Sequence, residues 1–346
     1  MKIAIIGAGA IGGYVGAKLA LAGEEVTFIV RGANLEAIRR DGIRLVTHDG
    51  VERSARNVAA TDDYARAGAH DVVVLALKAH QVEAVAHQVP KLFGADTTVV
   101  TMQNGIPYWY FHRHGGDLAG SVLRSVDPHG AIVNAIAPER VIGCVVYPAS
   151  ELVAPGTVRH IEGDRFPLGE LDGSVSGRVT RVSECFTRAG FKAPVLTDIR
   201  AEIWLKLWGN LTFNPISALT RSTLVDICQY GPTRDLAAAM MSEAQAVAEK
   251  LGITFRVNLE KRIAGAEKVG RHKTSMLQDV EAGREPELDA LVGSVVELGR
   301  LTRTPTPNID AVYALTNLLA RTIATPPSAP APRVEHACAP ASALPA

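Results

Sequence analysis

The sequence contains little cysteine and no excess of charge of either sign. Its four cysteines are scattered among 346 residues without a Cys-x-x-Cys pair, which argues against a disulfide framework or a zinc ribbon and favours reduced thiols. Lys plus Arg and Asp plus Glu both number 36, so the net charge is zero. The chain therefore lacks the basic excess typical of proteins that bind nucleic acids or membrane surfaces.

The sequence also lacks a hydrophobic run long enough to cross a membrane, and it starts on a strand-like segment, residues 2–6, instead of a secretory signal. We therefore expect a cytoplasmic protein. Its length, with 47% hydrophobic and 21% charged residues, predicts an ordinary globular protein of about two domains. Residues 325–346 are rich in Pro and Ala, and we expect this tail to be disordered and without a role in function.

A glycine-rich segment directly after the first strand-like run is the strongest local signal. It lies between a strand and a helical pattern that ends at Leu21, and residues 25–30 form a second strand-like run. In such a βαβ unit, Gly7 allows a tight turn, Gly9 lets the backbone approach a pyrophosphate and Gly12 lets the helix pack on the strand. The alternative is a turn that binds nothing. We predict a phosphate-binding loop made of Gly7, Ala8, Gly9, Ala10, Ile11 and Gly12.

The residue after the second strand indicates which dinucleotide binds. Sites for NAD or FAD normally have an Asp or Glu there, whereas this chain has Arg31. A cation suits a 2′-phosphate, so the sequence predicts NADP(H). The alternative is that Arg31 is an exposed arginine on a loop.

Strands and helices continue to alternate up to about residue 197. Lys78 and Asn104 each follow a further strand, at the edge where doubly wound sheets bind ligands, although Asn104-Gly105 can also be only a turn. We expect more short strands within 122–146 and 155–160, and a helix over 176–190. The predicted fold is a Rossmann-type doubly wound α/β sheet domain, residues 1–197, followed by an all-helical domain, residues 198–324.

An aromatic segment, residues 107–114, contains two histidines. His112 and His114 suggest zinc, but no third ligand is close in the sequence, so we expect no metal site. We expect the segment to pack over a cleft or at an interface.

The first helix of the second domain carries a line of polar residues. Lys206, Asn210 and Asn214 recur every four residues, so they share one face of a helix whose other residues are mostly apolar. Such a line suits a bound small molecule that accepts and donates hydrogen bonds, and a solvated stripe is the alternative. Asp198 is a candidate cap for this helix, and Pro215 predicts a kink in it.

Two further polar residues lie close to helix starts. Ser275 enters a short helix, and Pro286-Glu287 opens a predicted long helix that ends at Leu301. A simple helix cap is the alternative interpretation of Ser275, and pairing with the helix dipole is that of Glu287.

These motifs together resemble the 2-dehydropantoate 2-reductase (ketopantoate reductase) family over most of residues 1–320. The resemblance rests on Gly7–Gly12, Leu77-Lys78-Ala, Gln103-Asn104-Gly105, His129-Gly-Ala, Lys206-Leu-x-x-Asn210-x-x-x-Asn214-Pro, Ser275-Met-Leu-Gln-Asp-Val, Gly283-Arg284 and Glu287-Leu-Asp289. It implies reduction of ketopantoate to pantoate by NADPH. The alternatives are an NADP-dependent reductase of another 2-keto acid and a non-catalytic NADPH-sensing protein.

The resemblance also implies roles for individual residues. Lys206 matches the proton donor and Glu287 an acid near the lysine and the nicotinamide, so both are expected to be catalytic. The residues implied to contact substrate are Asn104, Lys206, Asn210, Asn214 and Ser275, and those implied to contact NADP are Arg31, Lys78, Asn104, Ala131 and Glu287. The expected partner is a small 2-keto acid, with no nucleic acid or membrane, and a homodimer is compatible with the sequence.

Two positions depart from the family pattern. Ile106-Pro107 and the aromatic segment stand where the family has a turn of small residues, and Leu224 occupies the place of an expected polar substrate contact. Both are expected near the substrate, so they bear on which 2-keto acid is used.

Overall fold

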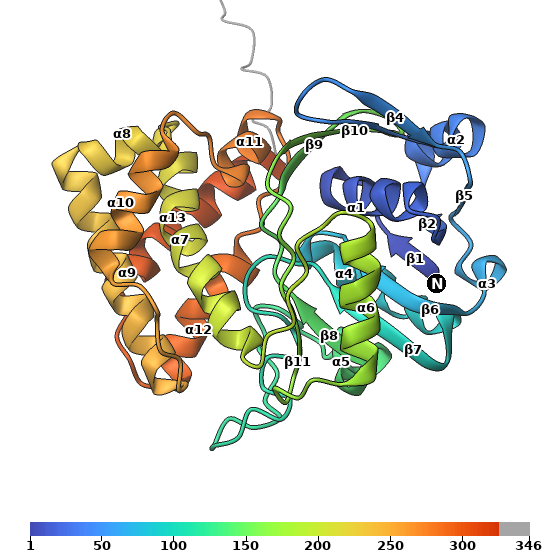
Figure 1. The fold of residues 1–346 in the computed structure, drawn as a ribbon. Helices are drawn as coiled ribbons and strands as arrows, with labels where there is room; N and C mark the ends of the chain where they lie inside the picture. Colours follow the sequence, from blue (N-terminus) through green and yellow to red (C-terminus); the bar gives the residue numbers. More distant parts are fainter. Residues whose placement is uncertain (325–346) are drawn as a thin grey trace, which may run out of the picture.

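The computed structural model describes residues 1–324, and the Pro- and Ala-rich tail expected to be disordered lies outside the described residues. A seven-stranded sheet, with strand order β11-β8-β7-β6-β1-β2-β5, forms the centre of the first part (Figure 1). Six of its strands pair in parallel: β1 (Lys2–Ile6), β2 (Glu25–Ile29), β5 (Val58–Thr61), β6 (His70–Leu75), β7 (Phe93–Thr101) and β8 (Val141–Cys144). Only β11 (Leu168–Glu170) runs antiparallel, beside β8.

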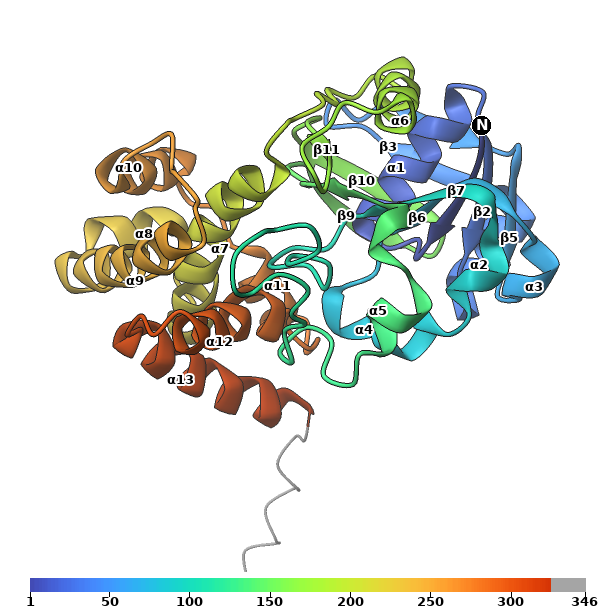
Figure 2. The same cartoon turned by 90° about the horizontal axis from the view of Figure 1, so that it is seen from below.

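Helices cover both faces of this sheet. The faces are buried because β1 and β6 are nearly continuous apolar runs, which is typical of central parallel strands. One face packs against α1 (Ala10–Leu21) and α6 (Gly177–Arg188), and the other against α4 (Ala79–Ala86) and α5 (Ala131–Ala135) (Figure 2). Two helices follow β2 and β5, namely α2 (Gly32–Asp41) and α3 (Tyr64–Ala67), and two short 3₁₀ turns span Val89–Leu92 and Pro138–Arg140. The Rossmann-type sheet predicted from the sequence is confirmed.

A second, four-stranded sheet lies over α1, and the sequence analysis recognised only one of its strands. Its order is β4-β3-β10-β9, formed by β3 (Ile43–Val46), β4 (Glu52–Ala55), β9 (Ala149–Ala154) and β10 (Thr157–Glu162). A Cβ on Gly13 of α1 would lie 2.4 Å from a Val158 methyl group, so the glycine allows the sheet to pack closely on the helix. The strand expected within 155–160 corresponds to β10.

The prediction of several short strands within 122–146 is wrong. Only β8 is a strand there, and α5 precedes it. The cause is the buried carboxylate of Asp127, which accepts hydrogen bonds from the N–H groups of Ile132 and Val133 at 3.0 and 2.9 Å. A carboxylate in this position caps a helix start, so the chain turns into a helix instead of extending.

After Asp198 all regular elements among the described residues are helical. They are α7 (Ile199–Thr220), α8 (Leu224–Gln229), α9 (Gly231–Lys250), α10 (Leu259–Val269), α11 (Ser275–Glu281), a π-helical turn (Asp289–Gly293), α12 (Ser294–Leu301) and α13 (Pro307–Ala324). Asp198 caps α7 by accepting from the Ala201 N–H at 2.9 Å, as expected, and α7 continues through Pro215. We propose residue 197 as the boundary between the two parts. None of the helices described here is long and apolar enough to span a membrane.

The helix expected to run from Pro286 to Leu301 starts later than predicted. Its first turn is the π-helical turn at Asp289, because the Leu288 N–H donates to the Pro286 carbonyl at 2.9 Å in a tight turn before it. Glu287 therefore lies in a loop and does not pair with the dipole of its own helix.

Candidate active site

The carboxyl ends of the parallel strands place several predicted site residues along one edge of the large sheet. The glycine loop follows β1, Lys78 follows β6 and Asn104 follows β7. Helix α7 of the second part lies across from this edge (Figure 1). The edge of a doubly wound sheet and a facing helix together form the usual place for a ligand.

The glycine loop has the geometry expected for a dinucleotide. Gly7 adopts φ +94°, which disfavours any residue with a side chain, and a Cβ on Gly12 would lie 1.9 Å from the Gly7 carbonyl oxygen. No side chain caps the start of helix α1. The first backbone hydrogen bond of the helix runs from the Gly13 N–H to the Gly9 carbonyl. The preceding N–H groups are therefore directed to an incoming anion.

One residue that supports this loop was missed from the sequence. Asn34 of α2 donates to the Ala8 carbonyl at 3.3 Å and accepts from the Gly156 N–H at 2.9 Å. It therefore ties the glycine loop to the β9–β10 turn. No local sequence pattern around Asn34 indicates this role, because both of its partners lie in other segments of the chain.

Arg31 and Lys78 differ in whether their charges are paired with other groups of the protein. Arg31 is exposed at the start of α2, and the described residues offer it no salt bridge or side-chain hydrogen bond. Lys78 donates to the Asp279 carboxylate of α11 at 2.6 Å and to the Glu285 carbonyl at 3.3 Å. Arg31 is thus available to an anion, whereas Lys78 links the two parts of the molecule.

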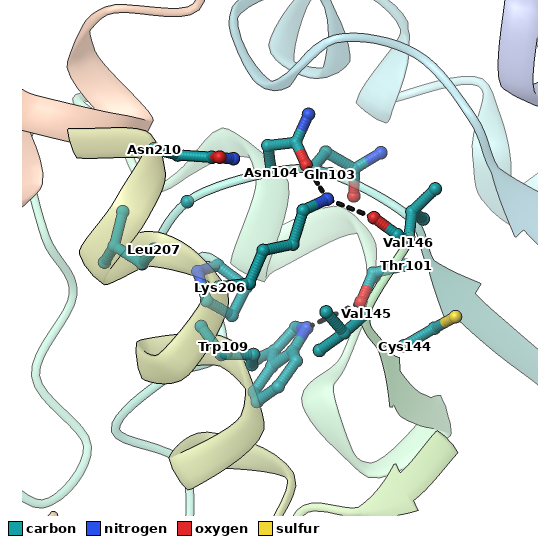
Figure 3. A pocket seen from close by; sticks show the side chains of 13 residues that line it. Thr101, Gln103, Asn104, Trp109, Cys144, Val145, Val146, Lys206, Leu207 and Asn210 are labelled. Carbon is teal, nitrogen blue, oxygen red and sulfur yellow. Dashed lines mark hydrogen bonds between the residues drawn. The ribbon is translucent and has the colours of Figure 1, made fainter. Parts of the chain in front are cut away.

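The ammonium group of Lys206 is at the centre of the site. It donates to the Asn104 Oδ1 at 2.6 Å and to the Val146 carbonyl (Figure 3). Burial lowers the pKa of Lys206 to about 8, and the charge of Glu287 opposes this shift. A buried amine with a pKa this close to neutrality can change its protonation state during a reaction.

Asn104 connects Lys206 to Glu287. Its Nδ2 donates to the Glu287 Oε2 at 3.4 Å, and the other carboxylate oxygen accepts from the Ala79 N–H at 3.1 Å. Glu287 thereby caps α4, which belongs to the sheet part, from a loop of the helical part. Glu287 therefore contacts the start of a different helix, α4, and does not pair with the dipole of its own helix.

The amides on α7 follow Lys206 along the helix. Asn210 is half-buried, lines the same cavity as Lys206 and Asn104, and extends toward them in Figure 3. Asn214 is buried one turn further on. Neither carboxamide has a side-chain hydrogen bond to another residue within 1–324, and only Asn210 lines the cavity.

Ser275 and Ala131 lie at helix starts. Ser275 is the exposed first residue of α11, and Thr274 supplies the cap by accepting from the Leu277 N–H at 3.3 Å, so the capping interpretation of Ser275 is wrong. Ala131 begins α5, which packs on α4. Among the described residues, no side-chain hydrogen bond joins either residue to the Lys206 group.

The aromatic segment forms part of the wall of the site. Trp109 lines the cavity, is buried, and donates from Nε1 to the Thr101 Oγ1 at 3.0 Å. Tyr110 accepts from the Trp204 Nε1 of α7 at 2.7 Å. The segment therefore packs between the sheet edge and α7, and His112 lies 3.7 Å from the Glu139 carboxylate.

The cavity beside Lys206 is small. Its volume is about 20 Å³, which is room for about one water molecule. The hydrogen bonds from Lys206 to Asn104 and Val146 close this small space on one side.

Comparisons with known proteins give a consistent result over nearly the whole chain. Residues 3–173 match the family model "Ketopantoate reductase PanE/ApbA", and residues 198–320 match "Ketopantoate reductase PanE/ApbA C terminal". The 2-dehydropantoate 2-reductase of Mesorhizobium japonicum is 57% identical over 321 residues, covering 92% of this chain and 98% of that protein.

Solved structures give the same result. One from Ralstonia solanacearum MolK2, assigned as a ketopantoate reductase, has a TM-score of 0.89 and 43% identity, covering 93% of this chain and 98% of its own. A dimeric ketopantoate reductase from Staphylococcus aureus has a TM-score of 0.70 and 20% identity, covering 93% and 100%. The second likeness shows the fold alone.

Proposed function

Because the chain belongs to the ketopantoate reductase family, we propose that it reduces 2-dehydropantoate to pantoate with NADPH. The observation that carries this proposal is the buried ammonium group of Lys206. It donates a hydrogen bond to Asn104 at the place where the edge of the sheet meets α7. Such a group can protonate an oxygen atom that gains negative charge.

The residues of the glycine loop fit a dinucleotide. A Cβ on Gly9 would meet no atom within 4 Å, so the space beside the loop is open, and the first turn of α1 presents free N–H groups to it. NADPH, when bound there, supplies the hydride for the reduction. Gly7–Gly12 would hold its pyrophosphate, Arg31 its 2′-phosphate, and Lys78 and Ala131 are proposed as further contacts.

Lys206 performs the proton transfer in this proposal. As the C2 carbonyl carbon accepts a hydride, its oxygen becomes an alkoxide, and the nearby ammonium group stabilises that charge and then delivers the proton. Lys206 would exchange its bonds to Asn104 and Val146 for the substrate oxygen. Glu287, joined to Asn104, keeps negative charge near the lysine and so favours its protonated form.

The remaining polar residues orient the substrate. Asn104, Asn210 and Asn214 bear carboxamides that donate and accept, and Ser275 has an exposed hydroxyl at the start of α11. We assign them to the carboxylate and hydroxyl groups of the 2-keto acid. Holding the carbonyl in one orientation supplies a large part of the rate enhancement in such reactions.

The proposed activity is tested by steady-state oxidation of NADPH with ketopantoate and, in parallel, with a panel of other 2-keto acids. We expect ketopantoate to have the highest kcat/KM. A higher value for another 2-keto acid would reassign the substrate and leave the chemistry in place. A protein that binds NADPH but turns over none of these acids would contradict the enzyme and support an NADPH sensor.

Arg31 is expected to determine the preference for NADPH. Replacing Arg31 with Ala removes the unpaired cation at the end of β2 and should raise the KM for NADPH by about 10–100-fold, the effect of losing hydrogen bonds to a charged group. The KM for NADH should stay within about twofold. Arg40→Ala on the same helix is a matched control, because Arg40 is exposed and paired with Asp41. Equal changes for both cofactors would exclude a 2′-phosphate contact.

We also propose a cytoplasmic location and a homodimeric assembly. The three cysteines within the described residues are free and buried, which suits a reducing compartment. The dimer is suggested by the dimeric relative from Staphylococcus aureus. Sedimentation analysis that finds only monomer at micromolar concentration would contradict it.

A further inference from the structure

A buried carboxylate lies one helical turn before Lys206. Glu202 of α7 has a side chain only 1% exposed, and three groups surround its carboxylate. The Tyr147 hydroxyl donates to Oε1 at 2.8 Å, Arg165 donates to the same oxygen, and Arg256 lies 2.9 Å from Oε2. Burial of a carboxylate is costly unless such partners compensate for it.

These partners come from both parts of the molecule. Tyr147 and Arg165 belong to the sheet part, in the segments after β8 and before β11, whereas Arg256 lies between α9 and α10. Burial would raise the pKa of Glu202, but the hydrogen bonds from Arg165 and Tyr147 and the nearby charge of Arg256 outweigh it and lower the pKa. Glu202 therefore stays ionised and remains paired with Tyr147, Arg165 and Arg256.

Tyr147 is the member of this group that reaches Lys206. The Lys206 Nζ lies 5.9 Å from the centre of the Tyr147 ring, and it donates to the carbonyl of the adjacent Val146. Tyr147 is 37% exposed overall, but its hydroxyl lies against the buried Glu202, and desolvation raises the pKa of Tyr147 to about 12. The hydroxyl therefore remains a donor to Glu202 near neutral pH. The ring is thus held at its hydroxyl end by Glu202, and the ammonium group of Lys206 lies over the ring.

We propose that Tyr147, anchored through its hydroxyl on Glu202, is a positioning residue that holds the ammonium group of Lys206 at the reaction centre and stabilises its charge. This role rests on the proposed function, in which Lys206 is the proton donor. A lysine side chain has several freely rotating bonds, and an anchored aromatic wall restricts them before the substrate arrives. The face of the ring attracts a cation, so the same contact favours protonated Lys206.

A test of this role has to leave the other charges around Lys206 and Tyr147 unchanged. The charged group acting on Lys206 is Glu287, and those acting on Tyr147 besides Glu202 are Arg165, Arg256 and Arg262. The Arg165 guanidinium also lies 5.1 Å from the centre of the Tyr147 ring. A change at Tyr147 alone leaves every one of these charges in the protein.

The test compares the pH dependence of kcat for ketopantoate reduction in wild type, Tyr147→Leu and Tyr147→Phe. Leucine keeps apolar bulk but removes the ring, so the pH at which kcat falls to half should move down by about 0.5–1 unit. Phenylalanine keeps the ring and loses its anchor, so it should lower kcat by about 3–10-fold with a smaller shift of the profile. A Tyr147→Leu profile that coincides with wild type, or moves upward, would overturn the proposal.

One control variant separates this role from a general loss of stability. Glu170 is also buried, though less deeply than Glu202, and pairs with Arg178 at 2.6 Å, yet no described contact joins it to Lys206. Glu170→Gln should lower the melting temperature as Glu202→Gln does, but only Glu202→Gln should shift the pH profile. A shift of equal size in both variants would mean that the effect is structural.

A second readout does not depend on catalysis. The pH dependence of acetylation of Lys206 by acetic anhydride, followed by peptide mass spectrometry, reports the fraction of neutral amine. In Tyr147→Leu, the midpoint of the acetylation curve should move to lower pH even if ketopantoate is not the substrate. Absence of turnover in wild type would refute the proposed function, whereas an unmoved acetylation curve would refute the role of Tyr147.

Discussion

Replacing Lys206 with Ala is expected to lower kcat for ketopantoate reduction by about 10²–10⁴-fold, the usual contribution of a positioned general acid. The variant loses both the proton and the positive charge that stabilises the alkoxide. Binding of NADPH should survive, because the glycine loop and Arg31 lie in other segments of the chain. Fluorescence titration with NADPH checks binding, and single-turnover kinetics check the chemical step.

The pH dependence follows from the same group. Burial lowers the pKa of Lys206 to about 8, and the charge of Glu287 opposes the shift. Reduction needs the protonated lysine, so kcat for reduction should fall as pH rises through about 8. Oxidation of pantoate needs the neutral amine, so its rate should rise over the same interval.

Lys250→Ala is a matched control for Lys206→Ala, because Lys250 is exposed at the end of α9. It should retain the activity and the pH profile of the wild type. Turnover of Lys206→Ala within a factor of a few of wild type would remove this lysine from the mechanism, whatever the binding data show.

Replacing Gly12 with Ala is expected to destabilise the fold strongly. The new Cβ would lie 1.9 Å from the Gly7 carbonyl oxygen and 2.8 Å from the Ala76 Cβ, and backbone cannot move aside as a flexible side chain can. Overpacking of this kind usually costs 1–3 kcal/mol and sometimes more, and a backbone clash this close places the cost at about 3 kcal/mol or above. Thermal unfolding measures it as a lower melting temperature.

Replacing Gly9 with Ala separates binding from folding. A Cβ at Gly9 would meet no atom within 4 Å, so the melting temperature without ligand should stay close to that of wild type. The methyl group would occupy the space through which the pyrophosphate approaches the backbone, so NADPH affinity should fall by about 10-fold or more. Wild-type affinity in Gly9→Ala would show that the dinucleotide does not bind at this loop.

Local patterns in the sequence were sufficient to predict much of the fold. The apolar run before Gly7 predicted a buried strand, and the helix capped by Asp198 was recognised from its spacing. Both depend on residues within a few positions of one another. The expected strands within 122–146 were wrong for a local reason, because the Asp127 carboxylate caps the start of α5 five residues later. The partner of Glu287 could not be read from local patterns, because it is the start of α4, 208 residues away in the chain.

The sequence by itself determined that a glycine loop follows the first strand and that one helix presents Lys206, Asn210 and Asn214 on a common face, because strand and helix periods are local properties. Only the tertiary structure decided what these groups meet. Lys206 and Asn104 are 102 residues apart in the chain, and their contact exists because α7 packs against the carboxyl edge of the sheet. That packing also buries the ammonium group, and burial is what brings its pKa to about 8.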